Sequence, residues 1–135
     1  MKDIETRTDI EILINRFYEK MLKDTIIGFI FTDIAKIDLN EHLTIICDFW
    51  ETILFTKPVY KRGPEVMKIH HELNKKIHLK KGHFTRWLYL FGSTVDELYS
   101  GENAEKAKEK ADSIAKLMQK RLGSVSCEDL DVTAN

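Results

Sequence analysis

The sequence predicts an all-α fold. Apolar residues recur at every third or fourth position in four long segments of the 135-residue chain, the spacing of one helix face. Strict alternation of apolar and polar residues, which indicates a half-buried strand, never persists beyond a few positions. The chain has only two prolines and six glycines, so few positions interrupt a helix.

The first two helices are expected over residues 8–23 and 41–56. Thr8 or Asp9 is available as the N-cap of the first helix. The second is unusually aromatic, and the dipeptide Lys57-Pro58 ends it because proline cannot continue a helix. Between the two lies a short apolar segment around Gly28, which suits a loop.

Three further helices are expected in the second half of the chain. A short one begins near Pro64 and ends near Asn74. A long one covers 84–98, with Gly101 as its C-terminal cap. The last covers 103–122 and has alanines that permit close approach of another helix. The stripes of these three helices consist of Val66, Met67, His70 and Leu73; Phe84, Trp87, Leu88, Phe91, Val95 and Leu98; and Ala107, Ala111, Ile114, Ala115, Met118 and Leu122.

Length and composition indicate one soluble domain. We expect a single core over residues 1–123 and a C-terminal tail without periodicity over 124–135. The longest apolar run, 26–31, is too short to cross a bilayer, and the first residues do not form a secretory signal. A cytoplasmic location is therefore expected. Cys47 and Cys127 form no CxxC motif and are expected to be reduced thiols.

Charge is unevenly distributed, although the net charge is only −1. Residues 61–86 hold eight basic side chains against Glu65 and Glu72, so this part carries +6 and the remainder −7. No nucleic-acid-reading motif accompanies the basic residues, and we expect no nucleic-acid partner. Carboxylates of a small ligand are an equally suitable target for such a field. The basic residues are Lys61, Arg62, Lys68, Lys75, Lys76, Lys80, Lys81 and Arg86.

Four polar aromatic side chains interrupt the apolar stripes. His42 and His70 lie in line with two stripes, and Tyr18 and Trp87 occupy two others. An imidazole turned into a core must find a partner or lose its hydrogen bonds to water, so two at once are unusual. They indicate an enclosed cofactor, with haem as the first candidate, since histidine is a common iron ligand. The alternative is a helical bundle whose histidines are satisfied in the core.

Several motifs together resemble the group III truncated haemoglobins over residues 8–120. Their order and spacing are more specific than any single histidine, and the chain lacks a Gly-Gly pair, as is usual in that group. The motifs are FYEKM (17–21), EHLTIICDFW (41–50), MKIHHEL (67–73), HFTRWLYLF (83–91) and AEKAKEKADSIAKLM (104–118).

The resemblance implies a truncated globin fold, a two-over-two helical sandwich around a non-covalent b-type haem (iron protoporphyrin IX). His70 is then the proximal iron ligand. The polar groups of the distal ligand-binding pocket are Tyr18, Trp87 and, at its entrance, His42. The residues implied to contact the haem are Phe17, Phe31, Ile46, Trp50 and Met67.

The region ahead of Met67 departs from the family pattern. It is longer by two residues, which makes His71 a rival for the iron. His70 is favoured because it keeps the spacing to Met67 and Leu73 and lies on their face. We expect His83 to lie at a helix start and Cys47 to be a small packing residue.

The resemblance implies a protein that binds dioxygen or another diatomic gas. Reaction of dioxygen with nitric oxide and peroxide detoxification are the alternatives in the enzyme class. Both require an external reductase, since no GxGxxG fingerprint is present. A gas sensor is less favoured because no output domain is attached, and a cofactor-free interaction bundle stays open. We expect no membrane partner and a monomer or weak dimer.

Overall fold

The computed structural model describes residues 1–30, 39–57 and 79–126, and of residues 121–126 only the backbone. It contains the helices α1 (Arg7–Lys23), α2 (Leu39–Phe55), α4 (Lys81–Leu98) and α5 (Glu102–Ser126). Within these ranges the chain forms no strand. The predicted all-α class is confirmed. The expected short helix near Pro64 lies outside the described residues.

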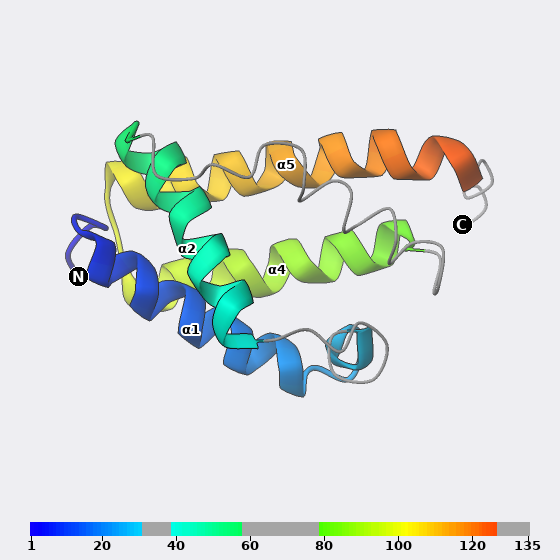
Figure 1. Cartoon of the computed structure of the whole chain (residues 1–135), viewed down its shortest axis with the longest axis horizontal. Coiled ribbons are helices and arrows are strands. Elements are labelled where there is room, and N and C mark those ends of the chain that lie inside the picture. Colours follow the sequence, from blue (N-terminus) through cyan, green and yellow to red (C-terminus); the bar gives the residue numbers. More distant parts are fainter. Residues whose placement is uncertain (31–38, 58–78, 127–135) are drawn as a thin grey trace.

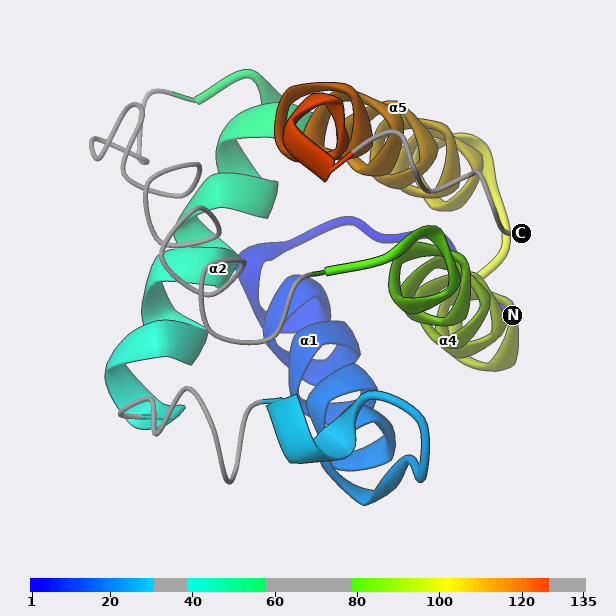
Figure 2. The same cartoon turned by 90° about the vertical axis from the view of Figure 1, so that its right-hand side faces the viewer.

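The four helices form two crossed pairs. Helices α4 and α5 run side by side in opposite directions, and α2 crosses over this pair (Figure 1). Viewed from the end, α1 and α2 make up the other pair (Figure 2). Helix α1 packs against both α2 and α4, so the buried face of α1 stands at the centre of the fold.

The core consists of one stripe from each helix. On α5 the stripe is made of alanines up to Met118, which lets α4 approach closely, as the sequence predicts. On α1 it is made of large apolar side chains together with Tyr18. The α1 stripe comprises Ile10, Leu13, Ile14, Phe17, Tyr18 and Met21, and the α5 stripe Ala104, Ala107, Ala111, Ala115 and Met118.

Helix α1 begins one residue earlier than predicted, and its cap is different. Thr6 is the N-cap, and its hydroxyl accepts a hydrogen bond from the backbone N–H of Asp9 at 3.3 Å. The Asp9 carboxylate accepts in return from the N–H of Thr6 at 3.1 Å. The prediction that Thr8 or Asp9 is the N-cap was wrong, since Asp9 occupies the third helical position of a capping box.

Asp9 is expected to make stability depend on pH. Burial raises the pKa of this carboxyl, but hydrogen bonds from Lys2 and from the N–H groups of Glu5 and Thr6 outweigh that effect and lower it overall. A lowered folded-state pKa gives stability that is present above the unfolded value of about 3.9 and is lost as pH falls through the folded value. Urea unfolding between pH 7 and pH 3 should show this loss. In Asp9→Asn, stability should fall by about 1–2 kcal/mol at pH 7 and depend less on pH. An unchanged pH dependence in that variant would contradict the assignment.

The first residues of the chain fasten the corner between α4 and α5. The Asp3 carboxylate accepts hydrogen bonds from the N–H groups of Asn103 and Ala104, both at 2.8 Å, and so caps α5. Gly101 lies against Asp3 with φ of 145°, a conformation that a residue with a Cβ rarely adopts. The prediction that Gly101 caps α4 was wrong: α4 ends at Leu98, and the carbonyl of Gly101 accepts the N–H of Glu105 at the start of α5.

The other helix ends differ little from expectation. Helix α2 ends at Phe55, before Pro58 as predicted, and Thr56 turns the chain with φ of 54°. Helix α5 continues through Gly123 to Ser126 rather than ending near residue 122. Residues 127–135 of the expected tail lie outside the described part of the chain.

The turn after α1 is tied to α4. Arg86 of α4 donates from Nε and Nη2 to one oxygen of Asp24, at 2.9 and 2.6 Å, and the other oxygen accepts from the N–H groups of Ile26 and Ile27. Gly28 packs so closely that an added Cβ would lie 2.7 Å from the carbonyl oxygen of Leu22. These contacts hold the end of α1 against the part of α4 that carries Trp87.

Two glycines offer a matched test of this packing. Gly28→Ala is expected to lower the free energy of unfolding by about 1–3 kcal/mol, because the backbone must move to admit the Cβ. Gly92, within α4, has no atom within 4 Å of the equivalent position other than those of its own stretch of helix. Gly92→Ala should therefore stabilise the protein by about 0.5–1 kcal/mol through the higher helix propensity of alanine. Chemical denaturation of both variants checks the pair, and equal effects would contradict the close contact at Gly28.

No helix in the described ranges is long and apolar enough to pass through a membrane.

Candidate functional site

Tyr18 and His42 are brought together by the crossing of α1 and α2. The phenolic oxygen of Tyr18 lies 2.7 Å from Nε2 of His42, a hydrogen-bond distance. Tyr18 is 6% exposed, and His42 is partly buried. The sequence predicts both residues for one site but does not predict that they bind each other.

Tyr18 is held as a neutral phenol. Burial, with a smaller contribution from Cys47, raises its pKa well above the usual value near 10. A phenol is a far stronger acid than the N–H of a neutral imidazole, and the bare imidazole nitrogen is the better base. The favoured arrangement is therefore the Tyr18 hydroxyl donating to Nε2 of a neutral His42.

Phe17 connects this pair to α4. Its ring meets those of Tyr18, Trp87 and Phe91 edge-on, with centroid separations of 5.4, 5.8 and 5.3 Å. Edge-to-face contacts at these separations are favourable because the positive edge of one ring faces the negative face of another. Phe17, predicted as an apolar neighbour of the site, is thus the residue through which Tyr18 and Trp87 share one cluster.

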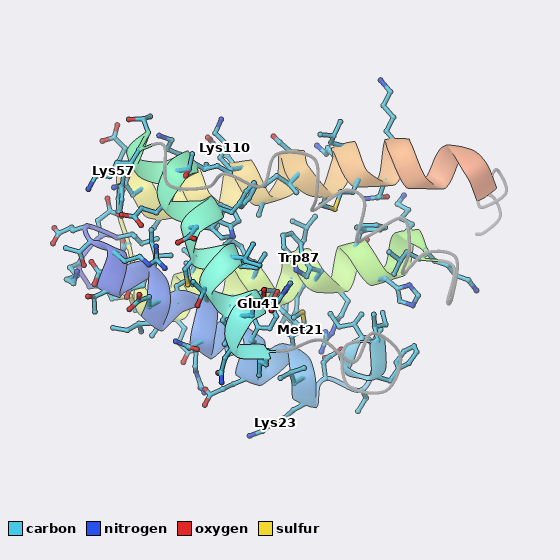
Figure 3. All side chains as sticks on the ribbon, viewed as in Figure 1. Met21, Lys23, Glu41, Lys57, Trp87 and Lys110 are labelled. Atoms are coloured by element: carbon cyan, nitrogen blue, oxygen red, sulfur yellow. The ribbon has the colours of Figure 1, made fainter. Side chains whose placement is uncertain are left out.

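A second set of rings is stacked in a nearly parallel, offset arrangement. Phe91 lies between Trp87 and Trp50, with centroid separations of 5.7 and 5.0 Å and interplanar angles of 10° and 18°. Figure 3 shows Trp87 on the middle of α4. The sequence places Phe91 on the core stripe but not in the site, although its position four residues after Trp87 puts it on the same helix face.

Trp87 differs from Tyr18 in how its polar group is engaged. An indole N–H can only donate, and among the described residues none accepts a hydrogen bond from it. The ring itself is partly buried against Phe17 and Phe91. Trp87 therefore offers a donor to a small molecule without first giving up another hydrogen bond within this part of the chain.

Helix α2 presents two adjacent stripes to the rest of the molecule. The first is fully buried and packs into the core, and it includes Trp50. The second contains His42 together with apolar side chains that remain only partly buried. The buried stripe is Cys47, Trp50 and Leu54, and the partly buried apolar residues are Leu39, Leu43, Ile46, Phe49 and Ile53.

The remaining site predictions fall into two groups. Ile46 and Trp50 lie on α2 as expected, Ile46 in the partly buried stripe and Trp50 in the core. Phe31, Met67, His70 and the rival His71 lie outside the described residues. In residues 1–30, 39–57 and 79–126, no group of three or more His, Cys, Asp or Glu side chains is arranged to hold a metal ion.

His83 and Cys47 have the structural roles that the sequence predicts for them. Nδ1 of His83 accepts the N–H of Lys80 at 3.0 Å at the start of α4, and burial, with the charge of Lys80, lowers its pKa. Cys47 is buried and free, and burial raises the pKa of its thiol to about 11, so it packs as a thiol. Of the basic residues between 61 and 86, Arg86 is bound to Asp24.

One of three comparisons with known proteins finds a match. No protein-family model matches the sequence, and no curated protein does. Among solved structures, the chain is similar to the crystal structure of a group III truncated haemoglobin from Campylobacter jejuni. The TM-score is 0.77 and the sequence identity 29%, over 93% of this chain and 98% of the other. The likeness supports a globin-type haem-binding protein. The resemblance indicated by the sequence motifs is confirmed: this chain has the truncated globin fold and is similar to the group III truncated haemoglobins.

Proposed function

We propose that this protein binds haem b without a covalent link and holds a diatomic gas, dioxygen in the first place, beside Trp87, Tyr18 and His42. The observation that carries the proposal is the Tyr18–His42 hydrogen bond joined through Phe17 to Trp87, within a truncated globin fold. When bound, haem supplies an iron atom that binds the gas. The side chains of the site provide the hydrogen bonds to the gas and the apolar contacts.

The described residues fit a haem. The partly buried stripe on α2 would provide an apolar surface for the ring, and the Tyr18–His42 pair would provide polar groups for a gas bound at its iron. The iron ligand in this proposal is His70, chosen because it shares a face with Met67 and Leu73 on the helix that the sequence predicts.

The two aromatic donors have unequal roles. The Tyr18 hydroxyl has one proton, which His42 engages, so a gas molecule must compete with the imidazole for it. The indole N–H of Trp87 has no such competitor among the described residues. Trp87 is therefore the principal donor to the bound gas, and His42 controls how much Tyr18 contributes.

Titration of the full chain with ferric haem tests the proposal. We expect saturation at one haem per chain, with a Soret band typical of a histidine-ligated globin. The haem should stay bound through repeated washes with imidazole-free buffer. Acidified organic solvent should extract it, since no CxxCH motif attaches it covalently. A chain that stays colourless after titration would contradict the proposal and favour the alternative of a cofactor-free helical bundle.

A further inference from the structure

The Tyr18–His42 pair has a chemical property that gas binding does not use. A buried phenol that loses an electron becomes a very strong acid and must release its proton to a group already in contact. The Nε2 atom of His42 lies 2.7 Å from the phenolic oxygen, within the range for direct proton transfer. The acceptor is an imidazole, which takes up a proton near neutral pH.

We propose that Tyr18 is a redox-active tyrosine whose one-electron oxidation is coupled to proton transfer to His42. A one-electron oxidant of high potential takes an electron from the phenol and is itself reduced. The O–H bond of Tyr18 breaks, the proton bonds to Nε2 of His42, and the products are a neutral phenoxyl radical and an imidazolium. One electron from a reductant such as ascorbate reverses the step and returns the proton.

Burial of the pair favours this coupled step over either half alone. Ionisation of Tyr18 before electron loss is opposed by burial, which raises the pKa of the phenol. Electron loss without proton transfer would leave a positive charge on a ring that is 6% exposed. The coupled step instead places the charge on His42, which is partly buried and closer to solvent than the phenol.

A second buried tyrosine provides a contrast within the same molecule. Tyr99 is also 6% exposed, but its hydroxyl donates to the backbone carbonyl of Asp9 at 3.0 Å. A carbonyl oxygen accepts a hydrogen bond but does not retain a proton near neutral pH. Two tyrosines of equal surface exposure therefore differ in their proton acceptor, which is the property that the proposal requires.

The proposal does not depend on haem, so its test uses the full chain without haem. Tyr60 and Tyr89 are replaced by phenylalanine to leave Tyr18 and Tyr99 as the only tyrosines. Each variant is checked for the helical circular dichroism of its parent. Photolysis with tris(bipyridine)ruthenium(II) and a cobalt(III) ammine acceptor generates the oxidant, and the radical is recorded by electron paramagnetic resonance after freezing.

We expect a tyrosyl signal that Tyr18→Phe removes and Tyr99→Phe leaves in place. His42→Gln, whose amide can still hydrogen-bond but cannot hold the proton, should reduce the signal to the level of Tyr18→Phe. The radical should form more slowly in D2O only where Tyr18 and His42 are both present. A signal that persists in Tyr18→Phe, or a full signal in His42→Gln, would overturn the proposal. Neither result would bear on haem binding, which the titration above tests separately.

Discussion

Replacement of His70 by alanine is expected to abolish the histidine-ligated haem spectrum, whereas replacement of His71 should leave it intact. The reason is the register that the sequence predicts: on the expected helix, His70 shares a face with Met67 and Leu73, and His71 is turned away from that face by about 100°. In the proposed site, His70 would be the one protein side chain that ligates the haem iron, so its loss is expected to have the largest effect of any substitution in this chain.

The comparison is made by haem titration of the two variants under the conditions used for the wild type. Addition of free imidazole should restore the spectrum of His70→Ala, since the small molecule can occupy the space that the side chain leaves. The reverse pattern, loss of the spectrum in His71→Ala alone, would show that the two extra residues ahead of Met67 shift the register by one position.

Trp87→Phe is expected to accelerate dioxygen release about tenfold, and Tyr18→Phe by less than about threefold. A tenfold change corresponds to about 1.4 kcal/mol, the range of one hydrogen bond to a partly charged acceptor. Tyr18 has less to lose because its proton is shared with His42 at 2.7 Å. His42→Leu should slow release, since the phenol is then able to donate to the gas alone.

Stopped-flow displacement of dioxygen by carbon monoxide measures all three rates. Phenylalanine preserves the aromatic contacts with Phe17 and Phe91 in the Trp87 variant, so the lost N–H is the main change. Faster release in Tyr18→Phe than in Trp87→Phe would contradict the unequal roles derived from the geometry.

The sequence was sufficient to predict the helices and most of the buried faces. Long apolar stripes with helical spacing gave α1, α2, α4 and α5 to within a few residues, because burial of one face dominates helix stability. The same spacing placed Tyr18, His42 and Trp87 on inward faces. The motif order added the globin fold, which periodicity alone does not distinguish from a plain bundle.

Contacts between segments far apart in the sequence could not be predicted from the spacing of apolar residues. The hydrogen bond from Tyr18 to His42 depends on the crossing angle of two helices and on their rotation about their own axes, which no local pattern encodes. The attachment of Asp3 to the start of α5 joins residues about a hundred positions apart and lies in a segment without periodicity. Gly101 was assigned to the wrong helix for the same reason, since a glycine between two helices can end the first or begin the second.

The infrared C–O stretching frequency of the carbon monoxide complex tests the central claim most directly. A hydrogen-bond donor next to the oxygen of carbon monoxide lowers this frequency by electrostatic stabilisation of negative charge on that atom. If Trp87, Tyr18 and His42 surround the gas with Trp87 as the main donor, the wild-type band should be low and should rise in Trp87→Phe more than in Tyr18→Phe. A wild-type frequency that neither substitution changes would show that this cluster does not face the bound gas.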